Sequence, residues 1–479
     1  MKSFLMKNKH ELALFVPLTI MLIFLGYYML YPVSVTYDPS MHAEIVKLIE
    51  WQGYPDTWEP YAQQSFTYTP FFHYLAFLLS LIGIHVIDAV RIIGILAYIL
   101  IPISTYLWAS SYYKKNKAIP ALSALVIAFL PLMGNIFLLG EFPEVLAIEL
   151  LVLLLYSIKT KRHLLAALFA GLTLLTHPFM VLVAVVLFLY NIKNMRGEDN
   201  KTKLLYFLIF AIVSGFWAIK YWEIMGNIAS GTWHNVVYNT QQPYLWFWAP
   251  HQILDFLFGF NQLGYLAFFF SLIGFWKIKD RFLRVFYLFC LVFTIYHLPY
   301  SQLKIFDLFS IPIAIFAAVG IWTIANLFKK NTKILVVGII IFLLAFFQVW
   351  HYVDVRTRWF TDSTLDDNLL DSTLWLKGYN ESFVRIYSER GSSWVGILAN
   401  KIPLYPYITD LEAYSDDYKE QLEDRDKIKE SIDNSDTTQL GQLLEKHEIK
   451  FMFVSENVTA DYLSKVYFNE GWSLYEVTS

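Results

Sequence analysis

Long apolar stretches separated by short charged runs fill most of the chain, and this pattern predicts membrane-spanning helices. A spanning helix needs about 20 mostly apolar residues, and Glu11–Leu30, Val86–Ser110 and Ile334–Val353 are stretches of this kind. From Asp354 onward the apolar runs shorten and turn residues become frequent. The pattern predicts a mainly α, polytopic membrane protein, with a membrane part at 1–353 and a small α/β domain at 354–479.

Basic residues between the apolar stretches define the predicted topology. Because lysine and arginine favour cytoplasmic loops, every basic cluster should lie inside, and each pair of clusters must be separated by an even number of crossings. The clusters occupy residues 2–9, 114–117, 159–162, 193–203, 277–284 and 329–333. The first stretch has no cleavage site after it and is expected to stay as an anchor. The N-terminus is then cytoplasmic and the C-terminal domain extracytoplasmic.

Two ambiguous stretches decide the number of crossings. Phe71–Ile82 is too short to span and is expected as a surface or re-entrant helix within a first outer loop at 32–85. His163–Tyr190 is interrupted at His177-Pro178 and is expected as two short helices with an outer turn, since proline suits the start of a helix. The chain then crosses the membrane about eleven times. The remaining predicted spans are Ile119–Leu139, Pro143–Ser157, Leu204–Trp222, Gln262–Trp276, Phe282–Leu298 and Ile305–Leu327.

The C-terminal domain carries both helical and strand patterns. Asp416–Ile432 and Thr437–His447 have the spacing of helices, and the short apolar runs read as strands. These predicted strands are Phe383–Ser388, Lys450–Ser455 and Trp472–Val477.

Composition agrees with the membrane assignment. Hydrophobic residues make up 57% of the chain and charged residues 16%, against about 25% charged residues in soluble proteins. Cys290 is the single cysteine, so no intrachain disulfide forms. The sequence contains neither a zinc nor a nucleic-acid motif, and no nucleic-acid partner is expected.

Asp38 stands at the centre of the chemistry that the sequence suggests. It precedes Pro39, and apolar residues then recur at helical spacing as far as Gly53. This predicts a helix with an aspartate N-cap, a proline at its first position and one apolar face. Asp38 could simply cap this helix. Alternatively, beside His42 and Glu44 at a membrane surface, it could act as a general base or metal ligand.

Three further polar groups are expected near the outer face. Glu141 and Glu144 flank Pro143 where the fourth span starts. They either pair with the positive end of that helix or help to hold a cation or an acceptor. His177 lies at the tip between two short helices, where it is either a hydrogen-bonded turn residue or part of the site.

Two basic residues on the predicted outer side could bind phosphate. Lys304, in a short outer loop, departs from the positive-inside trend. It is either a lysine that snorkels to the interface or a clamp for a lipid phosphate. Arg91 admits the same two interpretations. The aromatic-rich outer loop at 227–261 is typical of an interfacial belt, with stacking on sugars or guidance of a prenyl chain as the second interpretation.

Together these features resemble the GT-C superfamily of polytopic glycosyltransferases, which includes oligosaccharyltransferases, protein O-mannosyltransferases and lipid A aminoarabinose transferases. The resemblance covers the layout of the whole membrane part. It is most specific in Tyr37-Asp38-Pro39-Ser40-Met41-His42, which is similar to the first outer loop of oligosaccharyltransferases. The second match is Gly140-Glu141-Phe142-Pro143-Glu144, which is similar to their second acidic motif.

The resemblance implies inverting transfer of a sugar from a polyprenyl-phosphate-linked donor to a lipid, glycan or protein acceptor at the extracytoplasmic face. Asp38 would take or position the acceptor's proton, and Glu141 and Glu144 would hold a divalent cation or the acceptor. Lys304 or Arg91 would stabilise the leaving phosphate. Oxygen ligands of this kind favour Mg²⁺ or Mn²⁺.

Two alternatives to an active transferase stay open. A transporter or flippase for lipid-linked glycans usually has polar or broken helices at the midplane and paired repeats, whereas the acids here cluster at loop–helix junctions and no repeat is visible. An inactive GT-C-like scaffold is the other alternative, because Asp38 lacks the adjacent second acid that many members carry. The C-terminal domain also lacks a Trp-Trp-Asp motif, which argues against an ordinary protein N-glycosylating enzyme.

Overall fold

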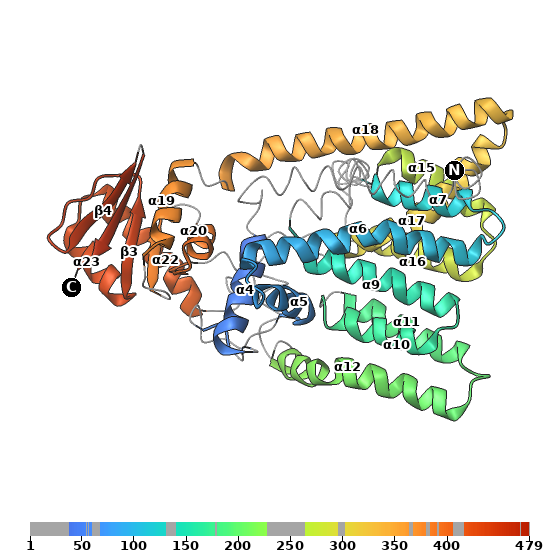
Figure 1. The fold of residues 1–479 in the computed structure, drawn as a ribbon, viewed down its shortest axis with the longest axis horizontal. Helices are drawn as coiled ribbons and strands as arrows, with labels where there is room; N and C mark the ends of the chain where they lie inside the picture. The colour runs from blue at the N-terminus through green and yellow to red at the C-terminus, as the bar shows by residue number, and fades with distance from the viewer. Residues whose placement is uncertain are drawn as a thin grey trace. The chain divides into compact units, whose positions relative to one another are not determined.

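The fold is mainly helical with one small sheet near the C-terminus (Figure 1). The computed structural model describes residues 38–53, 55, 57–59, 68–130, 140–177, 180–227, 264–295, 302–363, 367–379, 384–389, 392–405, 416–469 and 471–478. These residues form two compact units. The first contains the described residues of Tyr68–Phe72 and Ile92–Arg358, and the second those of Pro32–Thr67, His73–Arg91 and Trp359–Ser479.

Helices make up the first unit, and they coincide with the predicted apolar stretches. They are most of α6 (Val86–Tyr112), α7 (Ala118–Ala128), α9 (Phe142–Lys159), α10 (His163–Leu174), α11 (Val181–Asn194), α12 (Asn200–Asn227), α15 (Tyr265–Lys277), α16 (Arg281–Ile295), α17 (Gln302–Ala325) and most of α18 (Lys330–Ser363). The predicted break at His177 is confirmed, because α10 ends at Leu174 and α11 begins at Val181.

Several of these helices present apolar side chains to their surroundings, as lipid-facing helices do. Ile212 on α12 is 70% exposed and Phe342 on α18 is 67% exposed. Within the described residues, three helices have stretches long and apolar enough to cross a membrane, namely Val86–Tyr112, Leu308–Ala325 and Lys330–Phe347. The protein is therefore a multi-pass membrane protein, while the count of about eleven crossings stays a prediction.

Helices α6 and α9 run in the same direction. A Cβ at Gly94 would lie 2.5 Å from the ring of Phe142, and ten residues further along α6 Ser104 donates a 2.6 Å hydrogen bond to Glu149 Oε2 on α9. The second pair lies further along the sequence than the first on both helices, so α6 and α9 are parallel. The chain between two parallel helices must run back in the opposite direction. Helix α7 lies in this part of the sequence and packs on α6 through Tyr106, Ala121 and Ala124. The even crossing number predicted from the basic clusters requires the same arrangement.

The second unit combines two N-terminal helices with the C-terminal domain. Its helices are α4 (Asp38–Gln52), most of α5 (Phe71–Ser80), α19 (Asp367–Lys377), α20 (Ser392–Ala399), α22 (Asp416–Asp433) and α23 (Thr437–Lys446). The strands are β1 (Arg385–Ser388), β2 (Ile402–Pro403), β3 (Ile449–Val454), β4 (Leu463–Asn469) and β5 (Trp472–Val477). The helices predicted at 416–432 and 437–447 and the three predicted strands are confirmed, whereas α19, α20, β2 and β4 were not predicted.

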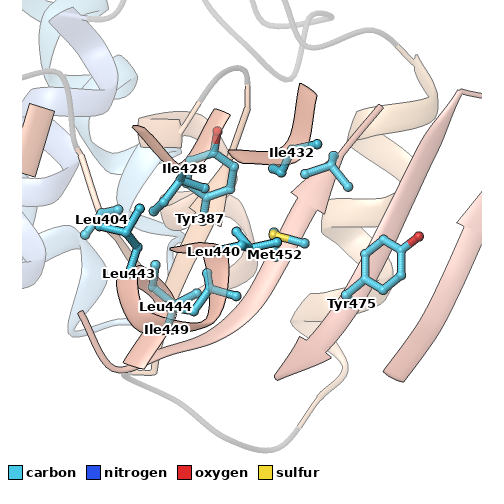
Figure 2. Packing of buried hydrophobic residues seen from close by; sticks show 11 residues of the cluster. Tyr387, Leu404, Ile428, Ile432, Leu440, Leu443, Leu444, Ile449, Met452 and Tyr475 are labelled. Atoms are coloured by element: carbon cyan, nitrogen blue, oxygen red, sulfur yellow. The ribbon is translucent and has the colours of Figure 1, made fainter. Parts of the chain in front are cut away.

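The sheet has the strand order β2-β1-β3-β5-β4. Strand β1 pairs in parallel with β2 and β3, while β5 pairs antiparallel with β3 and β4. Met452 and Val454 of β3 pack with the leucines and isoleucines of α22 and α23 in one buried cluster (Figure 2). Phe451 alternates to the opposite face, where its ring lies 5.1 Å from that of Tyr379, just after α19. Helices therefore cover both faces of the sheet.

Candidate active site

Helix α4 carries the predicted catalytic aspartate and begins at Asp38. It ends where predicted, because Gly53 has a φ of 75° and its N–H donates a 3.0 Å bond to the carbonyl of Ile49. A residue in the left-handed region commonly terminates a helix, and glycine adopts it without strain. The position of Asp38 is thus given by the start of a 15-residue helix, while its side chain lies outside the described residues.

Burial of α4 extends beyond its predicted apolar face. Every residue from Pro39 to Ile49 is buried, including His42 at 2%, Glu44 at 0% and Lys47 at 3% exposure. Buried polar groups need hydrogen-bonding partners, and neighbouring elements of the same unit supply them for His42 and Lys47. These neighbouring elements are distant from α4 in the sequence, so the pattern of α4 alone could not reveal them.

His42 meets a histidine that the sequence reasoning missed. Its Nδ1 lies 3.2 Å from Nε2 of His73 on α5, and the ring centroids are 5.2 Å apart. His73 is fully buried. Asp38 and His42 are four residues apart on α4, which places them on the same side of the helix. The signal for His73 was present, since it interrupts the otherwise apolar run Phe71–Ile82 with a titratable group.

Lys47 was also missed, and it ties α4 to the C-terminal domain. Its Nζ donates to Asn400 Oδ1 at 2.8 Å and to the carbonyl of Ile397 at 3.4 Å. A lysine in a predicted outer loop departs from the positive-inside trend in the same way as Lys304, so the sequence offered a signal here too.

Glu141 and Glu144 open α9 as predicted. Glu141 occupies the N-cap position, Pro143 follows in the first turn, and Glu144 is completely buried. The side chain of Glu141 makes no capping hydrogen bond to the helix. Between them Phe142 packs on Gly94 of α6 and on Phe72 of α5, with ring centroids 6.4 Å apart. The start of α9 is therefore held by close contacts with two other helices.

His177 lies in a turn that is fastened to the segment before α5. Thr69 Oγ1 donates a 2.8 Å bond to the carbonyl of Thr176, and the N–H of Phe71 donates a 2.9 Å bond to the carbonyl of Leu175. His177 is 6% exposed, and its N–H donates to the carbonyl of Thr173 at 3.3 Å. The turn interpretation of His177 thus has direct support in its backbone bonds.

The two predicted phosphate ligands lie on α6 and α17. Arg91 stands in the second turn of α6 and is 2% exposed. Lys304 belongs to the first turn of α17, and its side chain lies outside the described residues, as do residues 228–261 of the predicted aromatic-rich loop. Asp38, His42, Glu44 and Arg91 belong to the second unit, and Glu141, Glu144, His177 and Lys304 to the first. Their convergence on one site stays a prediction.

The described residues do not form a site for the predicted Mg²⁺ or Mn²⁺. No group of three histidine, cysteine, aspartate or glutamate side chains within the described parts of the chain could hold a metal ion. His42 turns one ring nitrogen to His73 instead.

Glu149 is a further buried acid that the sequence reasoning passed over. It lies in the middle of α9, is 3% exposed, and accepts the hydrogen bond from Ser104 described above. Burying an ionisable residue inside a spanning helix costs free energy, and such residues commonly have a functional role. The sequence signal for Glu149 was a glutamate within the predicted span Pro143–Ser157.

Comparison with known proteins shows a shared fold and no detectable sequence family. No family model and no curated protein matches the chain. ArnT from Cupriavidus metallidurans, bound to undecaprenyl phosphate, aligns over 96% of this chain and 97% of its own with 10% identity and a TM-score of 0.56. The chain therefore has a GT-C-like fold, as the sequence resemblance predicted.

Two other solved structures share this fold. The oligosaccharyltransferase of Archaeoglobus fulgidus, in complex with Zn and sulfate, aligns over 92% of this chain and 67% of its own, with 14% identity and a TM-score of 0.50. The arabinofuranosyltransferase AftD from Mycobacteria aligns over 97% of this chain and 40% of its own, with 12% identity and a TM-score of 0.51. At these identities the likeness concerns the fold.

Proposed function

We propose that the protein is a membrane glycosyltransferase that moves a sugar from a polyprenyl-phosphate-linked donor to an acceptor at the extracytoplasmic face. The observation that carries this proposal is the alignment with ArnT bound to undecaprenyl phosphate, which extends over 96% of this chain and 97% of that one. A polyprenyl phosphate is the leaving group that such a donor would release.

The reaction is an inverting displacement. The acceptor's hydroxyl oxygen attacks the anomeric carbon, the bond from that carbon to the phosphate oxygen breaks, and polyprenyl phosphate leaves. Asp38 takes the proton from the hydroxyl as general base. Its position at the first residue of α4 supports this role, because a fully packed helix holds a base in place more firmly than a loop does.

Arg91 and Lys304 stabilise the departing phosphate in this proposal. Negative charge grows on the phosphate as the glycosidic bond breaks, and cationic hydrogen-bond donors lower the energy of that state. Arginine can present two parallel N–H groups to phosphate oxygens, whereas lysine acts as a point charge. The start of α6, where Arg91 lies, is packed through Gly94 against Phe142, which stands between Glu141 and Pro143.

Glu141 and Glu144 bind the acceptor in this proposal, and His42, Glu44 and His177 are further polar groups of the predicted site. Carboxylates accept hydrogen bonds from hydroxyl groups, and such bonds would orient the attacking oxygen. The complete burial of Glu144 at the head of α9 supports a role in a closed site rather than on a solvated surface.

The proposed orientation places the N-terminus in the cytoplasm and residues 354–479 outside. A cysteine introduced by Asn116→Cys should be shielded from an impermeant thiol reagent in intact cells, and one introduced by Asn235→Cys should be labelled. Cys290 is buried and is replaced by serine in both variants to remove background. Labelling at 116 with protection at 235 would reverse the orientation and refute the proposal.

Mass spectrometry of cell-surface glycans tests the proposed function. A deletion strain should lack a single sugar on one acceptor, and the wild-type gene should restore it. Asp38→Asn should fail to restore it at normal protein levels, whereas the exposed-site control Asp426→Asn should succeed. Unchanged glycans in the deletion strain would overturn the proposed activity, and full rescue by Asp38→Asn would remove Asp38 from its role as base.

A further inference from the structure

Lys47 is a buried lysine that joins two segments far apart in the sequence. It is 3% exposed, and its Nζ donates to Asn400 Oδ1 at 2.8 Å across 353 residues of chain. It also donates to the carbonyl of Ile397 at 3.4 Å. Both partners lie at the C-terminal end of α20, and α4 packs on α20 within the second unit. The Asp38 helix is thus bonded directly to the C-terminal domain.

The end of α20 is well suited to receive an ammonium group. Carbonyl groups in the last turn of a helix carry partial negative charge and lack intrahelical partners. Asn400 follows the helix with a φ of 58°, a left-handed conformation that asparagine tolerates better than most residues. Its side-chain oxygen therefore joins the helix carbonyl as a second acceptor for Lys47.

The same end of α20 is fixed to the rest of the domain. A Cβ at Gly396 would lie 2.5 Å from the ring of Pro403 on β2, so helix and strand are in close contact. Lys401 is buried, and its Nζ donates a 3.1 Å bond to the carbonyl of Tyr379, just after α19. These contacts connect the end of α20, and with it the partners of Lys47, to α19 and to β2 of the sheet.

Burying Lys47 is unfavourable for stability. Desolvation lowers the pKa of Lys47 to about 8 from 10.5, and the nearby charges of Lys377 and Lys401 act in the same direction, while Glu44 and Glu50 oppose them. Replacing a buried ion by an apolar group of similar size is often neutral or stabilising. Lys47 costs stability but makes two directed hydrogen bonds. Its role is therefore better explained by positioning α4 against α20 than by stabilising the fold.

We propose that Lys47 is a positioning residue that couples the C-terminal domain to α4 and thereby holds Asp38 in place for the reaction. This inference rests on the proposed function. A helix moves as a unit, so loosening α4 from α20 displaces its first residue as well, and small displacements of a catalytic group cost large factors in rate.

The test uses the full-length protein with three variants. Lys47→Met keeps the length of the side chain and removes the ammonium, Asn400→Gly removes the acceptor while tolerating the left-handed backbone, and Lys377→Met removes a like charge from an exposed position on α19. Hydrogen–deuterium exchange reports on residues 38–52 and 392–405, a thermal melt reports stability, and initial rates give kcat and KM for sugar transfer.

Lys47→Met should speed exchange in both segments by about tenfold and lower kcat by about tenfold with little change in KM, without lowering the melting temperature. Asn400→Gly should produce the same exchange change, and the double variant should be no worse than either single one. Lys377→Met should resemble the wild type.

Unchanged exchange in Lys47→Met would overturn the coupling. If activity falls only in proportion to a lowered melting temperature, Lys47 has a structural role, and this result would also overturn the coupling. If Lys47→Met exchanges faster than the wild type but the wild type transfers no sugar, the coupling stands and the proposed function is wrong. The two failures are therefore distinguishable.

Discussion

His42 on α4 and His73 on α5 bring ring nitrogens to within 3.2 Å of each other, and both side chains are almost completely buried. One nitrogen must donate and the other accept, so the pair fixes the ring orientation of each histidine. His42 shares a side of α4 with Asp38. The contact therefore holds a polar group in a defined orientation next to the proposed base.

Replacing His73 should impair the reaction more than the fold. His73→Phe keeps an aromatic ring but removes the nitrogen, which should cost about 1 kcal/mol of stability and lower kcat by about tenfold because His42 loses its orienting partner. Thermal melts and initial rates measure the two effects. His85→Gln, a change to another histidine of the same unit, should leave both unchanged. Wild-type kcat in His73→Phe would contradict the orienting role.

The hydrogen bond between Ser104 and Glu149 should stabilise the parallel pair α6 and α9. Ser104→Ala removes the 2.6 Å bond to the carboxylate and should lower stability by about 1 kcal/mol, a usual value for such bonds in membrane bundles. Ser123 is buried on α7, and its hydroxyl donates to the carbonyl of Ile119 in its own helix at 2.9 Å. Ser123→Ala is therefore the control, and equal losses in the two variants would refute a special role for the cross-helix bond.

Glycines allow α15 and α17 to approach closely. A Cβ at Gly274 would lie 1.8 Å from the carbonyl oxygen of Phe316, and one at Gly320 would lie 2.0 Å from that of Phe270. Small residues at helix contacts are a common means of packing in membranes. Gly274→Ala should lower stability by about 1–3 kcal/mol because backbone atoms must separate.

Gly338 on α18 provides the matched control, since a Cβ there would meet nothing within 4 Å. Gly338→Ala should be neutral or stabilising by up to about 1 kcal/mol through better helix propensity. Thermal unfolding in one detergent compares the two. A neutral Gly274→Ala variant would show that α15 and α17 are less closely packed than this account requires.

Asp424 is the centre of a charged cluster that joins α22 to α23. Its carboxylate accepts bonds from Lys427 at 2.8 Å, from Lys446 at 2.6 Å and from His447 at 3.0 Å. Burial alone would raise the pKa of Asp424, but these three hydrogen bonds outweigh it and lower the pKa below 3.8. Asp424→Asn should cost about 2 kcal/mol, because bonds to a charged partner are lost.

The same cluster predicts how stability varies with acidity. A carboxylate with a lowered pKa contributes its stabilisation fully above the ordinary value of 3.8 and loses it as the pH falls further. The wild type should therefore exceed Asp424→Asn in melting temperature at neutral pH, and the difference should shrink below about pH 4. Asp426, which is 67% exposed, serves as control through Asp426→Asn. A difference independent of pH would argue against the charged form.

The elements were predicted well where periodicity alone determines them. Within the described residues the predicted apolar stretches form helices, the break at His177 was found, and β5 matched the predicted Trp472–Val477. Strand β4 was missed because Leu463–Asn469 mixes polar and aromatic residues at a sheet edge, with a register shift between Lys465 and Tyr467. Short elements such as α20 take their stability from packing that the local sequence does not show.

The candidate site was predicted less completely, for a physical reason. Sequence patterns indicated Asp38, Glu141 and Glu144, because each stands at a helix start. Lys47 and His73 depend on contacts across hundreds or tens of residues, with Asn400 and His42 respectively. Such partners are a property of the tertiary fold. Both residues were visible as polar interruptions, and only the fold showed what they contact.

Release of polyprenyl phosphate by the purified protein in lipid vesicles tests the central claim most directly. With donor lipid and acceptor from the native membrane, mass spectrometry should detect one polyprenyl phosphate for each sugar transferred by the wild type. Asp38→Asn should retain donor binding and release at least about a hundredfold less, as expected for loss of a general base. Release by Asp38→Asn at the wild-type rate, or transfer without any released polyprenyl phosphate, would contradict the account.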